Sequence, residues 1–265
     1  MTISSLSAAE AAALLRDAHD TATPIAPLRD RVAVSDAAAA YAIQETNTQH
    51  WLAQGRRLAG RKIGATSKAV QTMLGLDQPD YGMLFADMAY GDGETIPMSR
   101  VLQPKVEGEI AFYLSDDLDG DGLTLADVLH AVDYAVAAIE IVGSRIADWN
   151  IKILDTVADN ASAGLYVLGS QPRRLGEFDP VLCGMVMECR GEPVATGAGV
   201  ACLGNPLVST LWLARKMVEV GRPLKRGDTI LSGSLGPLVP VAAGDAIELR
   251  ISGLGAVRCS FDGAR

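Results

Sequence analysis

The first quarter of the chain has the hydrophobic spacing of helices. Ser7-Ala-Ala-Glu10 has the pattern of a capping box, and an Ala- and Leu-rich stretch follows it to about His19. A second stretch with helical spacing runs from about residue 35 to Gly55, and a short third helix is expected over Ser67–Leu74. These patterns predict a small, mostly helical N-terminal region.

The spacing then changes to that of strands. Within 106–114, apolar residues and glycine alternate with Glu107, Glu109 and two further residues, which is the period of a β-strand. Tyr134–Val142 is a continuous apolar run interrupted by one acid, Glu140, and is typical of a strand buried on both faces. The C-terminal third contains four short strand patterns, at 230–231, 238–241, 246–251 and 256–261.

Other segments complete the predicted fold. Leu58–Gly64 predicts a short strand, Asp80-Tyr81-Gly82 a turn, and Met83–Ala86 another strand. Helices are expected near Leu125–Val132 and Ser209–Val220. Together these elements predict an α+β fold, with a small helical N-terminal region at 1–75 and a β-rich catalytic domain at 76–265.

Composition and charge narrow the possible partners. The chain has 265 residues and a net charge of -9, which argues against nucleic acid or an anionic membrane as a partner. No apolar run approaches the ~20 residues that span a bilayer, and the N-terminus lacks the basic and apolar regions of a signal peptide. The four cysteines include no C-x-x-C pair. We therefore expect a cytoplasmic protein with reduced thiols.

Three glutamates form a candidate metal site. Glu107 and Glu109 lie two residues apart on one strand, so they share a face and repel each other. One interpretation is a solvent-exposed outer face. The other is a divalent cation between the carboxylates, because their oxygens suit Mg²⁺ or Mn²⁺. Glu140 favours the second interpretation, since an ionised acid in a buried strand is costly unless it is paired or bound to metal. Neither strand offers an obvious Lys or Arg as counter-ion.

Lys62 and Asp80 are weaker candidates when taken alone. Lys62 ends an apolar strand beside Gly64, where it could bind a substrate carboxylate or move protons. An exposed lysine at a strand end explains the same pattern, and composition favours that simpler interpretation. Asp80 follows Pro79, so by itself it indicates a turn residue.

Taken together, the motifs resemble one family. The segments that carry the resemblance, in order, are Gly60–Gly64, Asp77–Gly82, Leu84–Met88, Leu102–Glu109, Glu140–Arg145 and Asp155–Ser162. With these segments the chain resembles the hydratase/decarboxylase branch of the fumarylacetoacetase superfamily, and the likeness extends over residues 25–255. The resemblance implies a β-rich mixed sandwich-roll body, like the C-terminal part of fumarylacetoacetase, behind the helical N-terminal region. It also implies a homo-oligomer.

The resemblance implies roles for particular residues. Glu107, Glu109 and Glu140 fall on the positions that bind Mg²⁺ or Mn²⁺. Lys62 and Asp80 fall on positions used for acid/base work, and Ser162 falls where the substrate is contacted. The implied activity is hydration of a small 2-hydroxy-dienoate substrate, 2-hydroxypenta-2,4-dienoate, to 4-hydroxy-2-oxopentanoate in the meta-cleavage catabolism of aromatic compounds. The downstream aldolase of that pathway is a candidate partner.

Two alternatives stay open at this point. The first is 2-oxo-3-hexenedioate (4-oxalocrotonate) decarboxylase, which the same metal chemistry would serve. It ranks second because segments 148–152 and 234–239 look more like the hydratase, and because the sequence places no extra cation for a second carboxylate. The other alternative is a non-catalytic subunit that stabilises a partner enzyme. The intact set of Lys62, Asp80 and three glutamates speaks against it.

Overall fold

Two helices open the described part of the chain, which in this computed structural model comprises residues 5–33, 36–75 and 77–263. They are α1 (Ala8–Asp20) and α2 (Ala37–Ala53). The predicted capping box starts α1, because Ser7 Oγ accepts the Glu10 N–H and the Glu10 carboxylate accepts the Ser7 N–H at 2.8 Å. A separate apolar cluster joins both helices to α5 (Ile153–Ala158), and it includes Ala11, Leu15, Ile43, Leu154 and Val157.

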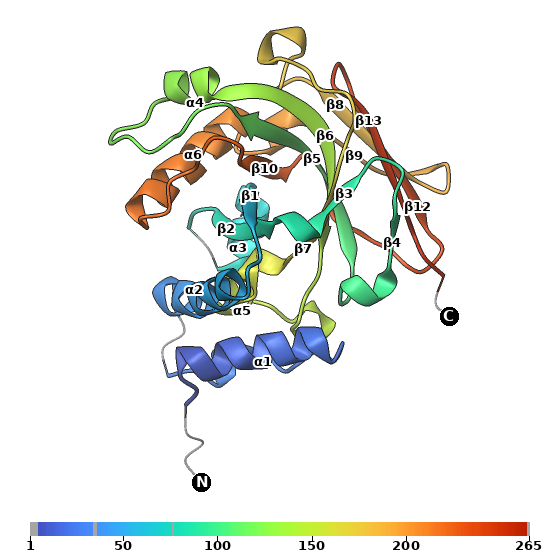
Figure 1. Ribbon diagram of the computed structural model, residues 1–265. Coiled ribbons are helices and arrows are strands. Elements are labelled where there is room, and N and C mark those ends of the chain that lie inside the picture. The colour runs from blue at the N-terminus through green and yellow to red at the C-terminus, as the bar shows by residue number, and fades with distance from the viewer. Residues whose placement is uncertain (1–4, 34–35, 76, 264–265) are drawn as a thin grey trace.

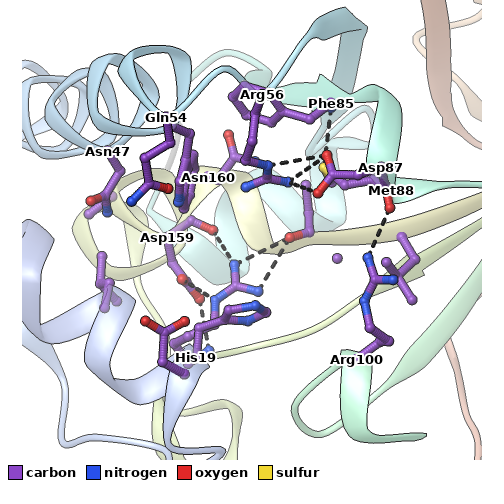
Figure 2. Close-up of a pocket in the computed structure, with 18 residues that line it drawn as sticks. His19, Asn47, Gln54, Arg56, Phe85, Asp87, Met88, Arg100, Asp159 and Asn160 are labelled. Carbon is purple, nitrogen blue, oxygen red and sulfur yellow. Dashed lines mark hydrogen bonds and ion pairs between the residues drawn. The ribbon is translucent and has the colours of Figure 1, made fainter. Parts of the chain in front are cut away.

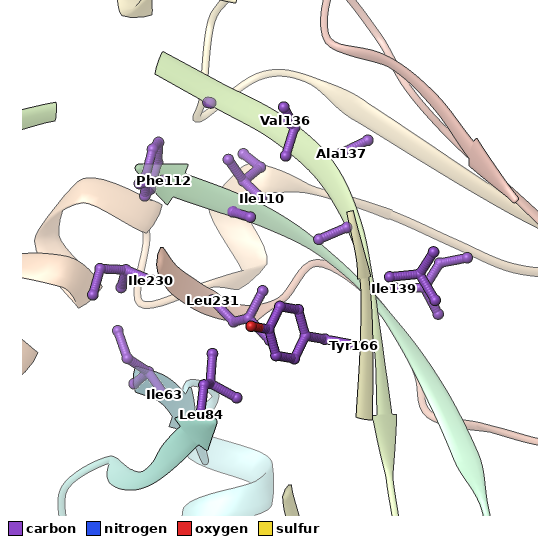
Figure 3. Close-up of a cluster of buried hydrophobic side chains, with 14 of the residues drawn as sticks. Ile63, Leu84, Ile110, Phe112, Val136, Ala137, Ile139, Tyr166, Ile230 and Leu231 are labelled. Atoms are coloured by element: carbon purple, nitrogen blue, oxygen red, sulfur yellow. The ribbon is translucent and has the colours of Figure 1, made fainter. Parts of the chain in front are cut away.

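A large curled sheet forms the centre of the molecule (Figure 1). Eight strands of the described chain build it, in the order β2-β1-β10-β5-β6-β7-β3, with β11 alongside β5. Their bounds are β1 (Leu58–Gly64), β2 (Asp80–Phe85), β3 (Ala89–Gly91), β5 (Lys105–Leu114), β6 (Val132–Val142), β7 (Ala163–Leu168), β10 (Thr229–Ser234) and β11 (Val239–Pro240). Figure 3 shows buried apolar side chains of the main core on these strands, among them Ile63 of β1, Ile110 of β5 and Ile139 of β6.

A second sheet packs on one side of the first. Its order is β4-β13-β12-β8-β9, with bounds β4 (Thr95–Ile96), β8 (Gly184–Cys189), β9 (Glu192–Ala198), β12 (Ala246–Ile251) and β13 (Gly255–Phe261). Contact between the sheets is close at Gly108, where a Cβ would lie 2.5 Å from Met185 Sδ and 2.6 Å from a Leu249 methyl. The side of β5 opposite this contact carries Glu107 and Glu109, which leaves them free to face the inside of the curled sheet.

Three further α-helices of the described chain alternate with strands along the sequence: α3 (Lys68–Leu74), α4 (Leu125–Ala131) and α6 (Pro206–Glu219). Ser67 caps the start of α3, and Gly75 ends it with a left-handed φ of 77°. The start of α6 lies three residues before the predicted one, because Asn205 caps it and Pro206 occupies its first turn. No helix among the described residues is long and apolar enough to cross a membrane.

The predicted fold class is confirmed, with one local correction. Asp80-Tyr81-Gly82 is not a turn but the fully buried start of β2. Gly82 is there because a Cβ would overlap the carbonyl oxygen of Asn160, so the glycine permits close packing and does not mark a turn. The division at residue 75 stays a prediction. β1 lies before residue 75, in the predicted N-terminal region, but it is hydrogen-bonded to β2 and β10 of the large sheet.

Candidate metal-dependent active site

The three candidate metal ligands lie together. The antiparallel register of β5 and β6 places Glu107 directly opposite Glu140, and Glu109 lies two residues further along the same face of β5. One oxygen from each carboxylate can be chosen so that all three lie within 4.8 Å of one another. Glu109 and Glu140 are buried, with 0% and 1% of their surface exposed. The alternation also allowed these glutamates to lie on a solvent-exposed outer face, and that interpretation is therefore wrong.

The carboxylate oxygens lack the partners that burial requires. Glu109 Oε2 accepts the Gly233 N–H at 2.8 Å, but Glu109 Oε1 and both Glu140 oxygens have no hydrogen-bond partner among the described residues. Burial, followed by the neighbouring carboxylates, raises the pKa of Glu107 to about 7 and that of Glu109 well above its usual range. Clustered carboxylate oxygens without hydrogen-bond partners are the donors that a hard divalent cation prefers. The residues present therefore fit such an ion.

Lys62 is buried beside these carboxylates, so the simple interpretation of an exposed strand end is wrong. Only 3% of its surface is exposed, and its Nζ lies 3.2 Å from Glu140 Oε1 without the geometry of a hydrogen bond. The same nitrogen donates to the carbonyl oxygen of Ala161 at 3.0 Å. Burial opposes the charged form, but Glu140 and the other acids outweigh it and raise the pKa of Lys62. These acids therefore favour the ammonium form of Lys62.

Asp80 reaches the same place from β2. Its strand register puts it opposite Gly64, and a Cβ at position 64 would overlap Asp80 Oδ1. That oxygen is buried and has no hydrogen-bond partner among the described residues. Burial raises the pKa of Asp80, although Lys62 acts against the rise. A carboxyl group with a raised pKa beside an ammonium is suited to exchange a proton.

Ser162 lies on an unusual turn at the edge of the site. Asn160, Ala161 and Ser162 have φ values of 56°, 51° and 57°, a left-handed conformation that costs non-glycine residues on the order of 1–3 kcal/mol each. The Ser162 hydroxyl lies 3.1 Å from the Thr156 hydroxyl. The turn also presents the Ala161 carbonyl to Lys62. We call residues 160–162 the left-handed turn.

One cavity of about 560 Å³ brings these groups together. Lys62, Asp80, Glu107 and Ser162 all line it, while Glu109 and Glu140 are buried next to Glu107 and are not part of the lining. The remaining lining is largely apolar and includes Val70, Met73 and Leu74 of α3, together with Ile151, Pro237 and Leu238. A small, partly apolar substrate with one anionic end suits this lining.

The sequence reasoning missed Lys105 and Trp149. Both line the same cavity, with Lys105 Nζ 4.2 Å from the centroid of the Trp149 ring. Lys105 stands two residues before Glu107, so the alternation that placed the glutamates on one face also placed this cation there. The expectation that neither strand offers a cation was therefore wrong.

The fold and the site define a family. Residues 52–262 match the family model for the fumarylacetoacetate (FAA) hydrolase C-terminal region, and the chain belongs to this family.

Relatives within the family are more specific. The chain is 60% identical over 252 residues to the "TodF product hydratase" of Pseudomonas putida strain F1, an alignment that covers 95% of this chain and 94% of that protein. It is 56% identical over 256 residues to "2-keto-4-pentenoate hydratase 1" of Dechloromonas aromatica, with 97% of each covered. A solved structure, 4-oxalocrotonate decarboxylase from Pseudomonas putida G7 complexed with magnesium and adipate, superposes with a TM-score of 0.92 at 34% identity and covers 96% of this chain and 97% of its own.

Proposed function

We propose that this chain is a metal-dependent hydro-lyase that converts 2-hydroxypenta-2,4-dienoate and water to 4-hydroxy-2-oxopentanoate in the meta-cleavage catabolism of aromatic compounds. The observation that carries the proposal is the set of buried acids and one buried lysine around a single cavity. The two hydratases that are 60% and 56% identical over nearly the whole chain support the choice of reaction. A non-catalytic subunit would have no use for these costly buried charges.

Glu107, Glu109 and Glu140 would hold the cation, which we propose to be Mg²⁺ or Mn²⁺. When bound, the ion supplies a Lewis acid for the negative charge that develops on the substrate during the reaction. The magnesium in the related decarboxylase structure supports the choice of a divalent ion. The orphaned oxygens of Glu109 and Glu140 support it independently.

The protein side chains would move the protons. The reaction shifts the enol proton of the substrate to its terminal carbon, and water then adds across C3 and C4. Lys62, held as an ammonium, and Asp80, with its raised pKa, are the groups that can give and take these protons inside a partly dry cavity. Ser162 lies on the cavity wall, where its hydroxyl can hold the substrate.

The first expected result concerns Gly64. In Gly64→Ala the new Cβ would push the Asp80 carboxylate from its place, so we expect kcat to fall, on the order of 10²-fold for a displacement of about 1 Å. Loss of the dienoate absorbance measures the rate, and circular dichroism checks folding. Gly176→Ala is the matched control, because a Cβ there meets nothing within 4 Å. Unchanged kcat in Gly64→Ala would show that catalysis does not depend on the position of Asp80.

The decarboxylase is the second candidate, and Lys105 is the observation that favours it. Lys105 lines the cavity as an extra cation and could bind the second carboxylate of 2-oxo-3-hexenedioate. The higher identity to the hydratases outweighs this, so we expect little or no CO₂ release from 2-oxo-3-hexenedioate while 2-hydroxypenta-2,4-dienoate is consumed. Both substrates are given to one metal-loaded preparation, and CO₂ is measured directly. Efficient release would assign the chain to the decarboxylases.

The assembly of the enzyme stays a prediction. We propose a homo-oligomer in the cytoplasm that passes its 4-hydroxy-2-oxopentanoate to an aldolase. The family resemblance supports the oligomer, and the chemistry of the product supports the aldolase. Light scattering on the purified protein measures the oligomeric state. Co-purification of the aldolase with the tagged enzyme tests the partnership.

A further inference from the structure

The left-handed turn determines where the Lys62 ammonium lies. Ala161 supplies the hydrogen-bond acceptor of Lys62 Nζ at 3.0 Å, and Glu140 supplies its ion-pair partner at 3.2 Å. Three successive residues with a Cβ do not hold a left-handed conformation unless their surroundings impose it. The groups that restrain the turn therefore also determine the position of Lys62.

Arg145 holds the turn from the side away from the catalytic cavity. Its Nη2 donates to the Asp159 carbonyl at 2.7 Å, and both terminal nitrogens lie 3.3 Å from the Ala163 carbonyl. These two carbonyls flank the left-handed turn, so one guanidinium spans its ends. The Arg145 side chain also pairs with the Asp159 carboxylate, which accepts the Arg145 backbone N–H at 2.9 Å. This arrangement uses the planar fork of arginine, which lysine lacks.

Asn160 ties the turn to the strand that carries Asp80. Its Oδ1 accepts the Met83 N–H at 2.7 Å, and its Nδ2 donates to the Met83 carbonyl at 2.9 Å. The turn is thus fixed to β2 on one side and to Arg145 on the other. Through the Ala161 carbonyl, the position of Lys62 depends on that of the turn.

Arg145 and Asp159 do not line the catalytic cavity. They lie on the wall of a second cavity of about 470 Å³, which Leu15 and His19 of α1 and Asn47 of α2 also line. Figure 2 shows Asp159 and Asn160 on this wall. The ion pair therefore contacts the left-handed turn from outside the catalytic cavity.

We propose that Arg145 and Asp159 are positioning residues that hold the left-handed turn and, through the Ala161 carbonyl, fix the position of Lys62 Nζ in the catalytic site. The proposal rests on the proposed function for its reaction and goes beyond it in assigning a role outside the cavity. The main effect expected of the pair is on kcat, because neither residue lines the catalytic cavity. Ser162 belongs to the same turn, so a small change in KM accompanies the loss of kcat.

The test begins with Arg145→Lys, which keeps the charge but cannot span both carbonyls. We expect kcat to fall about 10- to 100-fold, with KM and the Mg²⁺ dissociation constant within about threefold of wild type. Asp159→Asn is the milder second variant, in case Arg145→Lys does not fold. Arg56→Lys is the matched control, because Arg56 lines the same second cavity and pairs with Asp87 but does not contact the turn. It should keep the wild-type kcat.

A double-mutant cycle distinguishes a positioning effect of Arg145 on Lys62 from a general loosening of the structure. Placed on Lys62→Ala, the Arg145→Lys change should cost little further kcat, because the group that it positions is already gone. Guanidinium ion added to Arg145→Ala should restore part of kcat by entering the second cavity. Losses that multiply in the double variant, or a kcat that Arg145→Lys leaves unchanged, would overturn the proposal.

A failure of the proposed function would look different. If the wild type does not hydrate the dienoate, that function is wrong whatever Arg145 does. The positioning role of Arg145 and Asp159 is then tested by crystal structures of wild type and Arg145→Lys. Loss of the hydrogen bond between Lys62 and Ala161 in the variant supports the positioning role, and an unchanged hydrogen bond overturns it.

Discussion

We expect exhaustive removal of divalent metal to abolish hydration of 2-hydroxypenta-2,4-dienoate, and added Mg²⁺ or Mn²⁺ to restore it. The expectation follows from Glu109 Oε1 and both oxygens of Glu140, which are buried without hydrogen-bond partners in the described chain. Lys62 supplies one positive charge for the three carboxylates, and a divalent cation supplies the two that remain. Elemental analysis verifies the metal-free state, and ultraviolet absorbance follows the substrate. Full activity in a verified metal-free preparation would contradict the proposed chemistry.

Single substitutions of the three glutamates should be equally damaging. Glu107→Gln, Glu109→Gln and Glu140→Gln each remove one anionic ligand, so each should bring the rate close to that of the metal-free protein. Glu219→Gln is the matched control, since Glu219 is an exposed acid on α6 whose ion-pair partner in the described chain is Lys216. A glutamate whose replacement leaves metal-dependent turnover intact would not be a ligand.

Stability gives a second, independent signature of the metal site. A ligand that binds only the folded protein raises its melting temperature, so Mg²⁺ should stabilise the wild type but not Glu109→Gln. Without metal, Glu109→Gln should be at least as stable as the wild type. Its amide oxygen can still accept the Gly233 N–H, and one buried acid is gone. A metal-free variant that melts well below the wild type would show that Glu109 has a structural role instead.

The face of each strand could be predicted from the sequence, but the pairing of the strands could not. Alternation along 106–114 placed Glu107 and Glu109 on one side, and the apolar run around Glu140 indicated burial. That Glu107 stands opposite Glu140 is a matter of register, which depends on how the whole β5–β6 pair packs. The same alternation also places Lys105, two residues before Glu107, on the face that lines the cavity.

The positions of Lys62 and Asp80 depend on contacts between distant segments. β1 pairs in parallel with β10, about 170 residues further along the chain, and no local pattern signals such pairing. The left-handed turn is equally hidden, because Asn160-Ala161-Ser162 contains no glycine to indicate a positive φ. At Asp80 the error was the reverse, because the nearby Gly82 suggested a turn where the chain forms a strand. Gly82 instead permits close packing against the left-handed turn. In both cases a tertiary contact overrides the local signal.

Replacement of Lys62 by alanine should leave a folded, metal-loaded enzyme with a much lower kcat. Lys62 is not one of the three carboxylate ligands, and its removal takes a positive charge away from the metal site, so metal affinity should not fall. General acid/base groups contribute about 10²–10⁴-fold, and the loss of kcat should lie in that range. Steady-state kinetics at saturating Mg²⁺ and substrate measure it.

The split between kcat and KM decides what Lys62 does. If its ammonium only held the substrate carboxylate, Lys62→Ala would raise KM and leave kcat near normal. Its contacts indicate otherwise, because Nζ is fixed between Glu140 and the Ala161 carbonyl and is almost fully buried. Lys105→Ala is the matched comparison, since it removes a cation from the same cavity without touching either partner, and it should change kcat by no more than a few-fold. A Lys62→Ala enzyme with wild-type kcat at saturating substrate would show that Lys62 binds the substrate and does not move protons.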